Sequence, residues 1–295
     1  MQRFQSHEVR GHLAMLLFSA LVAGSFALGS RAANLIDPAA LNAMRFFLAS
    51  GIIGALVYFG PKTKRSDLAS PWRYMLLGGL FAVYFVTMFE GLKTAAPVSA
   101  SAVFTLTPVL SAGFGWLVLG QVTTPRMALA LALAGGGAVW VIFRGDLAAI
   151  TAFEIGRGEM IFFIGVVAHG LYTPMIKRLN RGESPLVFTL GMMLAGGLLL
   201  ALYGAKALIQ LDLSTLPAIV WITLGYVTVF ASAATFFLLQ YAVLHLKAAK
   251  VMAYTYLVPA WVIMWEIALG GPMVSASVLA GIGAVIVALL MLLKA

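Results

Sequence analysis

The sequence predicts an all-α integral membrane protein with ten transmembrane helices, arranged as an inverted repeat of five plus five. Three observations predict this fold class: an excess of apolar residues, ten apolar stretches of membrane-spanning length, and similarity between two halves. Of the 295 residues, 62% are hydrophobic and 10% are charged, and the mean hydropathy is +1.01. A soluble domain carries about 25% charged residues. One soluble core cannot bury this much apolar surface, so we expect lipid to surround the chain.

Each of the ten apolar stretches comes close to the roughly 20 residues that a helix needs to cross the hydrocarbon core. We expect spans at 12–30, 39–60, 72–93, 97–120, 126–143, 159–178, 185–204, 216–245, 248–269 and 273–293. The stretch 216–245 is long for one span, which predicts a tilted or extended helix. Prolines mark the breaks between spans, because a proline begins or ends a helix. They stand at Asp37-Pro38, Gly60-Pro61, Ser70-Pro71, Thr124-Pro125, Ser184-Pro185 and Gly271-Pro272.

The basic residues predict the orientation in the membrane. With a cytoplasmic N-terminus, the cytoplasmic segments hold Arg3, Arg10, Lys62, Lys64, Arg65, Arg73, Arg126, Lys177, Arg178, Arg181, Lys247, Lys250 and Lys294. The outer segments hold only Arg31, Lys93, Arg144, Arg157 and Lys206. The positive-inside rule therefore places both termini in the cytoplasm. It also accounts for the net charge of +9 without a nucleic-acid partner.

The N-terminal segment and the cysteine count bear on processing of the chain and on the kinds of site it can hold. The basic segment before the first span lacks a convincing signal-peptidase site, so we expect a retained first helix. The chain has no cysteine, which excludes disulfides and thiolate metal sites. We expect neither a metal nor a cofactor.

The internal similarity is clearest in the fourth and ninth spans. Adding 151 to Pro108 and Gly120 gives Pro259 and Gly271 in the second half. In the following spans, Gly135, Gly137, Ala138 and Val139 match Gly281, Gly283, Ala284 and Val285 at an offset of 146. We expect the five-residue change of offset in the connecting loop, where insertions are tolerated. Five is an odd number, so the second half enters the membrane from the opposite side. The predicted units are 1–146 and 147–295.

The segments TLTPVLSAGFGWLVLG and TYLVPAWVIMWEIALGG and the glycine-patterned fifth and tenth spans resemble the EamA family of the drug/metabolite transporter superfamily. The resemblance covers nearly the whole chain, and aromatic amino-acid exporters are the most similar branch. It implies a central cavity lined by spans 1, 3, 4, 6, 8 and 9. The family often has a glutamate just after the fourth and ninth spans. Gln121 and Pro272 stand there in this chain, so any role of that acid in gating or folding is open.

His169 is the deepest histidine, about ten residues from either end of the sixth span. Tyr172 follows at i+3 and shares its face. Polar groups in a span are costly and become functional candidates, so the imidazole could hydrogen-bond a substrate or take a proton. A structural histidine paired with a neighbouring carbonyl or hydroxyl is the open alternative.

Pro108 and Pro259 lie at matching depth in the fourth and ninth spans. Each proline removes a donor and frees the carbonyl four residues earlier, at Phe104 and Thr255. Such a break can offer backbone groups to a ligand, act as a hinge, or be a packing kink. Gly135, Gly136, Gly137, Gly281 and Gly283 favour close helix approach rather than phosphate binding.

Aromatic and hydroxyl side chains on these spans suit a planar or apolar ligand. The candidates for the cavity wall are Trp261 first, Tyr84 second, and then Tyr254, Thr107 and Ser111. Ordinary membrane-core packing explains aromatic residues equally well, so this assignment stays open.

Arg45, Glu90 and Glu266 all fall toward the outer side. A charge in lipid needs a partner. We expect Arg45 to pair with one of the two acids, as a static contact or as part of an outer gate. Glu266 is also the better acid for proton linkage, because the ninth span is expected to line the path.

These observations predict a transporter of small organic solutes in the bacterial inner membrane, and not an enzyme. The resemblance implies export of aromatic or other hydrophobic amino acids and related metabolites by alternating access. Other metabolites, drugs or a channel function are alternatives, although rings of charges typical of a pore are missing. An intramembrane enzyme would need a GxSxG or HExxH set, and the sequence has neither. The near-absence of deep cationic residues in the expected lining argues against phosphorylated substrates. Proton coupling and oligomeric state are open.

Overall fold

The computed structural model describes residues 2–60, 63, 64, 67, 69–152, 154–246 and 248–293. Ten helices in this part of the chain are long and apolar enough to cross a membrane. The all-α fold and the ten spans predicted from the sequence are therefore confirmed. Four of the basic residues used for the orientation, Lys62, Arg65, Lys247 and Lys294, lie outside the described residues, as does Pro61.

The helices follow the predicted stretches closely. The first half holds α1 (Gln2–Ala32), α2 (Pro38–Phe59), α3 (Trp72–Gly91), α4 (Pro97–Phe104), α5 (Thr107–Leu119) and α6 (Pro125–Ile142). The second half holds α8 (Arg157–Leu179), α9 (Pro185–Tyr203), α11 (Ala218–Thr228), η3 (Val229–Ala234), α12 (Thr235–His245), α13 (Ala248–Ala253), η4 (Tyr254–Leu257), α14 (Val258–Ala268) and α15 (Ala276–Leu293). Short helices α7 (Leu147–Thr151), α10 (Ala205–Gln210) and η2 (Leu213–Thr215) lie in the connections.

Several spans begin with a capping side chain followed by a proline. The Asp37 carboxylate accepts hydrogen bonds from the backbone N–H groups of Ala39 and Ala40 at 2.9 and 3.0 Å. Thr124 and Ser184 cap α6 and α9 in the same way. A proline at the first position has no N–H to leave unpaired, so cap and proline together fix each helix start.

The helix bounds repeat between the halves. The starts of α2 and α9 differ by 147 residues and those of α3 and α11 by 146, whereas α4 and α13, α5 and α14, and α6 and α15 all differ by 151. The predicted position of the offset change is therefore wrong. The change of offset falls between α3 and α4 in the first half, which corresponds to the stretch between α11 and α13 in the second. The reason is that the span from α11 to α12 runs over 28 residues and α3 over 20. The unit boundaries at 146 and 147 stay a prediction.

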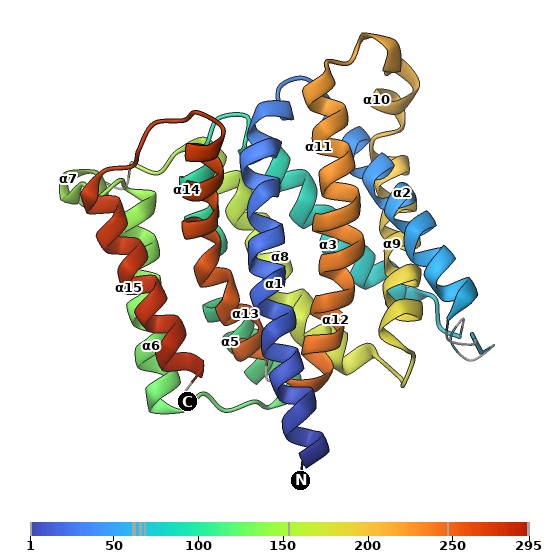
Figure 1. Cartoon of the computed structure of the whole chain (residues 1–295), viewed down its shortest axis with the longest axis horizontal. Helices are drawn as coiled ribbons and strands as arrows, with labels where there is room; N and C mark the ends of the chain where they lie inside the picture. The colour runs from blue at the N-terminus through green and yellow to red at the C-terminus, as the bar shows by residue number, and fades with distance from the viewer. Residues whose placement is uncertain are drawn as a thin grey trace.

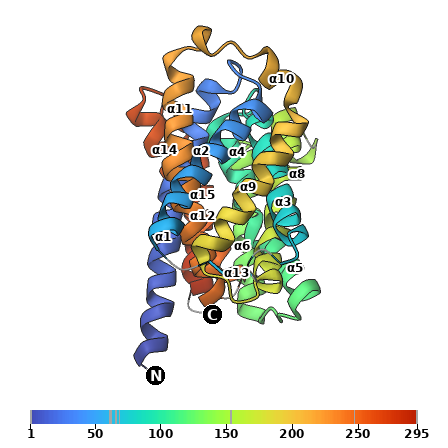
Figure 2. The same ribbon diagram turned by 90° about the vertical axis from the view of Figure 1, so that its right-hand side faces the viewer.

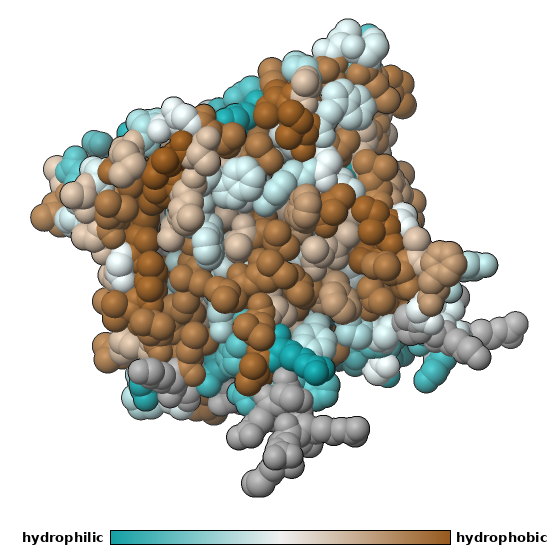
Figure 3. All heavy atoms as spheres, viewed as in Figure 1, coloured by the Kyte–Doolittle hydropathy of each residue, from teal (hydrophilic) through white to brown (hydrophobic). Residues whose placement is uncertain are grey.

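Figures 1 and 2 show the start of α1 and the end of α15 at one end of the molecule and α10 at the other. We call these the terminal end and the α10 end. With five spans in each half, α1 and its counterpart α8 run in opposite directions (Figure 1). Exposed apolar residues such as Leu129, Leu202 and Trp116 cover the sides of the bundle. Figure 3 shows this brown band, with hydrophilic residues gathered toward the two ends.

Two groups of helices face each other across the molecule. In one, α3 packs on α8 and α9, and in the other α1 packs on α11, α12 and α14. The pairs α6 with α15 and α2 with α9 join the two halves at opposite edges (Figure 1).

The pair of α6 and α15 meets at two of the five glycines in the predicted pattern. A Cβ on Gly137 would lie 2.8 Å from the Gly281 carbonyl oxygen, and one on Gly281 would lie 3.1 Å from the Gly137 carbonyl oxygen. The other three glycines have nothing within 4 Å of a built Cβ, so they do not serve close approach: Gly135, Gly136 and Gly283. The prediction of close approach is correct for Gly137 and Gly281 alone.

Candidate functional site

The fourth and ninth spans are both broken next to their prolines. Pro108 and Pro259 stand at the start of α5 and α14, after a turn and after the 3₁₀-helix η4. The two freed carbonyls have partners inside the chain. The Phe104 oxygen accepts from the Thr107 hydroxyl at 2.6 Å, and the Thr255 oxygen accepts from the backbone N–H of Val258. They are therefore not open to a ligand, and the hinge role stays a prediction.

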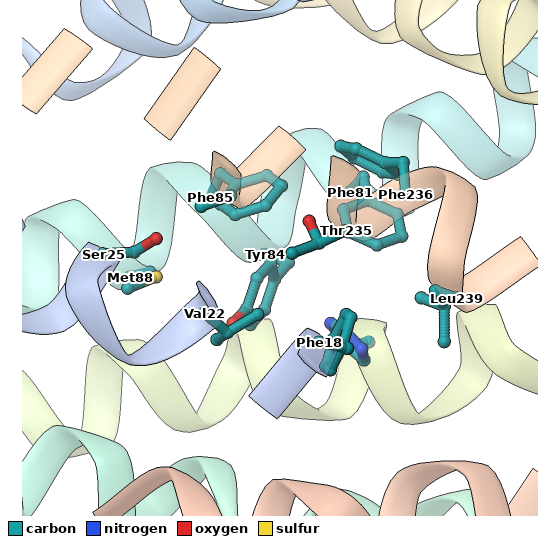
Figure 4. A pocket seen from close by; sticks show the side chains of 12 residues that line it. Phe18, Val22, Ser25, Phe81, Tyr84, Phe85, Met88, Thr235, Phe236 and Leu239 are labelled. Carbon is teal, nitrogen blue, oxygen red and sulfur yellow. The ribbon is translucent and has the colours of Figure 1, made fainter. Parts of the chain in front are cut away.

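A closed cavity lies in the middle of the molecule between the two helix groups. Its lining comes from α1 (Phe18, Val22, Ser25), α3 (Phe81, Tyr84, Phe85, Met88), α8 (His169), and η3 with α12 (Ala231, Thr235, Phe236, Leu239). Figure 4 shows the α1, α3 and α12 side chains converging on this space. Spans 1, 3, 6 and 8 contribute as the resemblance implies. The fourth and ninth spans give none of these lining residues.

His169 lies against the cavity with its ring enclosed by other rings. It is 2% exposed, and its ring centroid is 4.6 Å from that of Tyr84 and 5.3 Å from that of Phe104. Neither ring nitrogen has a hydrogen-bond partner in the structure. The alternative of a histidine paired with a neighbouring carbonyl or hydroxyl therefore does not hold here. An unpaired imidazole beside a cavity is available to a bound molecule.

Tyr84 lines the cavity as predicted, whereas Tyr172 does not. The Tyr172 hydroxyl donates to the Met192 sulfur at 3.0 Å, and the ring packs against Phe81 at 4.0 Å between centroids. Gln240 lies within 3.5 Å of the same hydroxyl. Although Tyr172 follows His169 at i+3, its polar group belongs to a contact between α8, α9 and α12.

The predicted lining residues on the ninth span contact α1 instead of the cavity. Trp261 donates its indole N–H to the Ser19 hydroxyl at 3.3 Å. The Tyr254 hydroxyl is 3.0 Å from His12 Nδ1. Both residues hold the ninth span to the first and neither lines this cavity, so the substrate-binding role that we expected for them stays a prediction.

The hydroxyls of the fourth span are also engaged in helix contacts. Thr107 is bonded to Phe104 as described above, and Ser111 donates to the Gly170 carbonyl oxygen at 3.1 Å. Ser111 therefore joins α5 to α8 one residue after His169. Neither hydroxyl lines the cavity.

Arg45 does not pair with an acid, so the predicted outer-side ion pair is wrong. Its guanidinium donates to the Ser232 hydroxyl and the Ala231 carbonyl oxygen, both at 2.5 Å. The predicted acids have other partners. Glu266 pairs with Arg31 at 2.8 Å, and Glu90 with Lys93 at 2.9 Å. The reason is local: η3 brings a carbonyl and a hydroxyl directly to the guanidinium.

Glu266 also borders a second hollow, at the α10 end. This cleft of about 310 Å³ lies between α4, α6, α14 and α15 and includes Ser99, Arg144 and Pro272. The ion pair of Arg31 and Glu266 ties α1 to α14 beside it. Proton linkage at Glu266 stays a prediction.

Most of the cavity lining escaped prediction from the sequence. On α3 the lining residues stand at i, i+3, i+4 and i+7, and on α1 at i, i+4 and i+7, which are single helical faces. This spacing was available in the sequence. The spacing does not distinguish a cavity-lining face from a lipid-facing face, however, because the lipid-facing sides of these spans are apolar as well.

The cavity is too small for an organic solute in this conformation. The space open to the centre of a water molecule is about 20 Å³, which holds about one water. Binding of a larger molecule therefore requires the helices around it to separate.

Comparison with known proteins gives three results. The sequence model described as the EamA-like transporter family matches residues 9–143 and again residues 156–294. A protein of Bacillus subtilis (strain 168) named "Uncharacterized transporter YyaM" is 27% identical over 281 residues, covering 94% of this chain and 91% of that protein. A protein known from a crystal structure is 19% identical, covers 97% of both chains and has a TM-score of 0.72, which shows a shared fold.

Proposed function

Because the chain belongs to the EamA-like transporter family, we propose that it exports small organic solutes through the central cavity, with aromatic and other hydrophobic amino acids as the first candidates. It is a multi-pass membrane transporter of the drug/metabolite transporter superfamily. The observation that carries the proposal is the cavity at the meeting of four spans, with an unpaired histidine in a wall rich in aromatic side chains.

The wall suits a planar ring. Phe18, Phe81, Phe85 and Phe236 line it together with Tyr84 and His169. Aromatic side chains bind one another edge to face or offset, and a ligand ring gains the same contacts. Sites for small molecules typically combine such apolar walls with a few polar groups that fix orientation. Tyr84, His169, Ser25 and Thr235 supply those groups here.

His169 is the polar group that gains most from a ligand. A buried nitrogen without a partner costs free energy, and a ligand donor or acceptor removes that cost. An ammonium or hydroxyl group of the solute can pair with the imidazole. Protonation of the same ring offers a route to proton coupling.

Alternating access accounts for a closed cavity between two helix groups. The group around α3 and α8 rocks against the group around α1 and α12, and the cavity opens to one side at a time. The helix breaks at Pro108 and Pro259 are the proposed hinges. In the bacterial inner membrane, with both termini in the cytoplasm, the terminal end faces inward and the α10 end outward.

Flux of labelled phenylalanine and tryptophan from proteoliposomes, with and without a pH gradient, tests this function. The companion variant His169→Phe keeps a ring but removes both nitrogens. Tyr172→Phe is the matched control, because its hydroxyl is bonded outside the cavity. We expect flux in the wild type and the control and a loss of about tenfold in His169→Phe, the value of one buried hydrogen bond of about 1.4 kcal/mol.

Each outcome has a distinct meaning. Flux that follows the pH gradient and loses this dependence in His169→Phe supports proton coupling through the histidine. Flux independent of the gradient supports a facilitative exporter. Folded wild-type protein that moves neither amino acid contradicts the substrate assignment.

A further inference from the structure

Arg45 is a buried cation without a counter-ion. Its side chain is 0% exposed and lies seven residues inside α2. All the carboxylate side chains of the chain are among the described residues, and none lies within 4.0 Å of its guanidinium. A charge at this depth is costly, and such residues typically serve the transported ligand.

Neutral groups satisfy the hydrogen bonds of Arg45 but not its charge. Besides the Ala231 oxygen and the Ser232 hydroxyl, it donates to the Asn42 amide oxygen at 3.3 Å. Its central carbon lies 3.7 Å from the centre of the Phe85 ring. These dipoles and the ring stabilise a cation, yet the positive charge remains uncompensated.

Arg45 lies directly behind the wall of the central cavity. Two of its contacts, Phe85 and Ala231, also line that cavity. Figure 4 shows Phe85 at the cavity edge, beside Tyr84. One layer of protein therefore separates the guanidinium from a bound solute. At this separation, in surroundings of low dielectric, a full charge acts strongly on another.

The cavity itself holds no other fixed charge. Among the lining residues, which are all described, the polar ones are Ser25, Tyr84, His169 and Thr235. The nearby guanidinium therefore favours an anionic group in the cavity and opposes a solute whose net charge there is positive.

We propose that the central site selects solutes that carry a carboxylate, and that Arg45 is the positioning residue for this selection, acting through the wall formed by Phe85 and Ala231. The inference rests on the proposed transport through this cavity. A carboxylate on the solute supplies the negative charge that no carboxylate side chain of the protein provides next to Arg45. Free and zwitterionic carboxylates share this chemistry.

A purely structural role for Arg45, as a clamp on η3, makes a different prediction. A clamp depends on its hydrogen bonds, whereas selection depends on charge. Three variants separate the two. Arg45→Gln removes the charge, Asn42→Asp adds a carboxylate beside the retained guanidinium, and Ser232→Ala removes one hydrogen bond without changing any charge.

Binding of two matched probes to the purified full chain tests the proposal. The probes are 3-phenylpropionate and 3-phenylpropionamide, which share shape and differ in charge. We expect the wild type and Ser232→Ala to bind the carboxylate at least about tenfold more tightly, or about 1.4 kcal/mol. In Arg45→Gln and Asn42→Asp the preference falls to near unity. A fourth variant, Arg45→Lys, retains the preference because it keeps the positive charge.

An equal preference for the two probes in the wild type overturns the proposal, as does an unchanged preference in folded Arg45→Gln. If that variant does not fold, Asn42→Asp decides, because it keeps the arginine and places a carboxylate beside it, although it also removes the hydrogen bonds that the Asn42 amide donates to the Pro38 and Phe85 carbonyl oxygens. Flux of phenylalanine against phenylalaninamide separates this inference from the proposed function. Flux of the amino acid with no charge preference contradicts the inference alone. A charge preference in binding without amino-acid flux contradicts only the assigned substrate.

Discussion

At the residue scale, His169 and Arg45 are two polar side chains of the membrane interior with opposite character. His169 faces the cavity, and neither of its ring nitrogens has a hydrogen-bond partner, whereas Arg45 donates its hydrogen bonds to neutral oxygens. The first was predictable, because a lone histidine at mid-span stands out in an apolar sequence. The partners of the second were not. A search for acids at similar depth led to Glu90 and Glu266. Every residue has a backbone carbonyl oxygen, however, so the sequence does not show which of them accepts a hydrogen bond from Arg45.

Another buried charge, at the terminal end, has its partner. Arg73 on α3 pairs with Glu183 in the α8–α9 connection at 2.7 Å, and the side chains are 0% and 2% exposed. Burial raises the pKa of the Glu183 carboxyl, but hydrogen bonds from Arg73 and from the Arg181 backbone outweigh it, so its pKa lies below the usual 4.5.

This shift predicts how stability depends on pH. A carboxyl with a lowered pKa in the folded state stabilises the fold above its unfolded pKa, and this contribution is lost as the pH falls through the folded value. Glu183→Gln should therefore cost about 3 kcal/mol at pH 7, since it leaves the buried Arg73 without its counter-ion. The difference from the wild type should shrink below pH 4.5. Unfolding in detergent across this range measures it, with the exposed Glu154→Gln as a neutral control. A difference that stays constant with pH contradicts the assignment.

At the element scale, the broken spans are the feature that the sequence predicts best. The prolines at matching positions predicted the break between α4 and α5 and the break between η4 and α14. The π-helix η3 was not foreseen, because VFASAA contains neither proline nor glycine to mark it. Its presence shows only in the length of the eighth span and in the changed offset between the halves.

The contact of α6 and α15 gives a test with a built-in control. Gly137→Ala places a methyl group 2.8 Å from the Gly281 carbonyl oxygen and from Val285. Such overpacking costs about 1–3 kcal/mol unless the helices part. The neighbouring Gly136→Ala meets nothing within 4 Å, and alanine favours a helix over glycine by up to about 1 kcal/mol. Thermal unfolding in detergent should therefore show opposite signs for the two variants. Equal effects would mean that this crossing is looser than the structure has it.

At the scale of the whole molecule, composition and span length were sufficient for the fold class. They were not sufficient for the cavity. Which faces of ten apolar helices meet one another depends on packing between distant segments, and lipid-facing and buried faces have similar compositions. Tyr84 was placed correctly, whereas Trp261, Tyr254 and Tyr172 proved to pack between helices. Aromatic residues alone therefore do not locate a transport path.

The closed cavity predicts restricted chemical access. The chain has no cysteine, so an introduced thiol reports only its own site. Ser25→Cys places a thiol at the cavity, and Ser214→Cys places one on the exposed α10 end. Without substrate we expect the first to react with a maleimide at least about tenfold more slowly, since it must wait for an opening that costs 1.4 kcal/mol or more. A transported solute should accelerate it. Equal rates at both positions would contradict a closed resting state.

The π-helix has a consequence for the phase of the eighth span. Each residue of an α-helix advances the helix by about 100°. The wider turns of η3 take up an extra residue, so every later side chain points in another direction than it would in a regular α-helix of the same sequence. Phe236 and Leu239, which come after η3, owe their direction toward the cavity to that rotation. If Val229–Ala234 formed a regular α-helix with the same number of residues, both side chains would turn away from the cavity. The π conformation of this segment thus decides which face of α12 meets the solute.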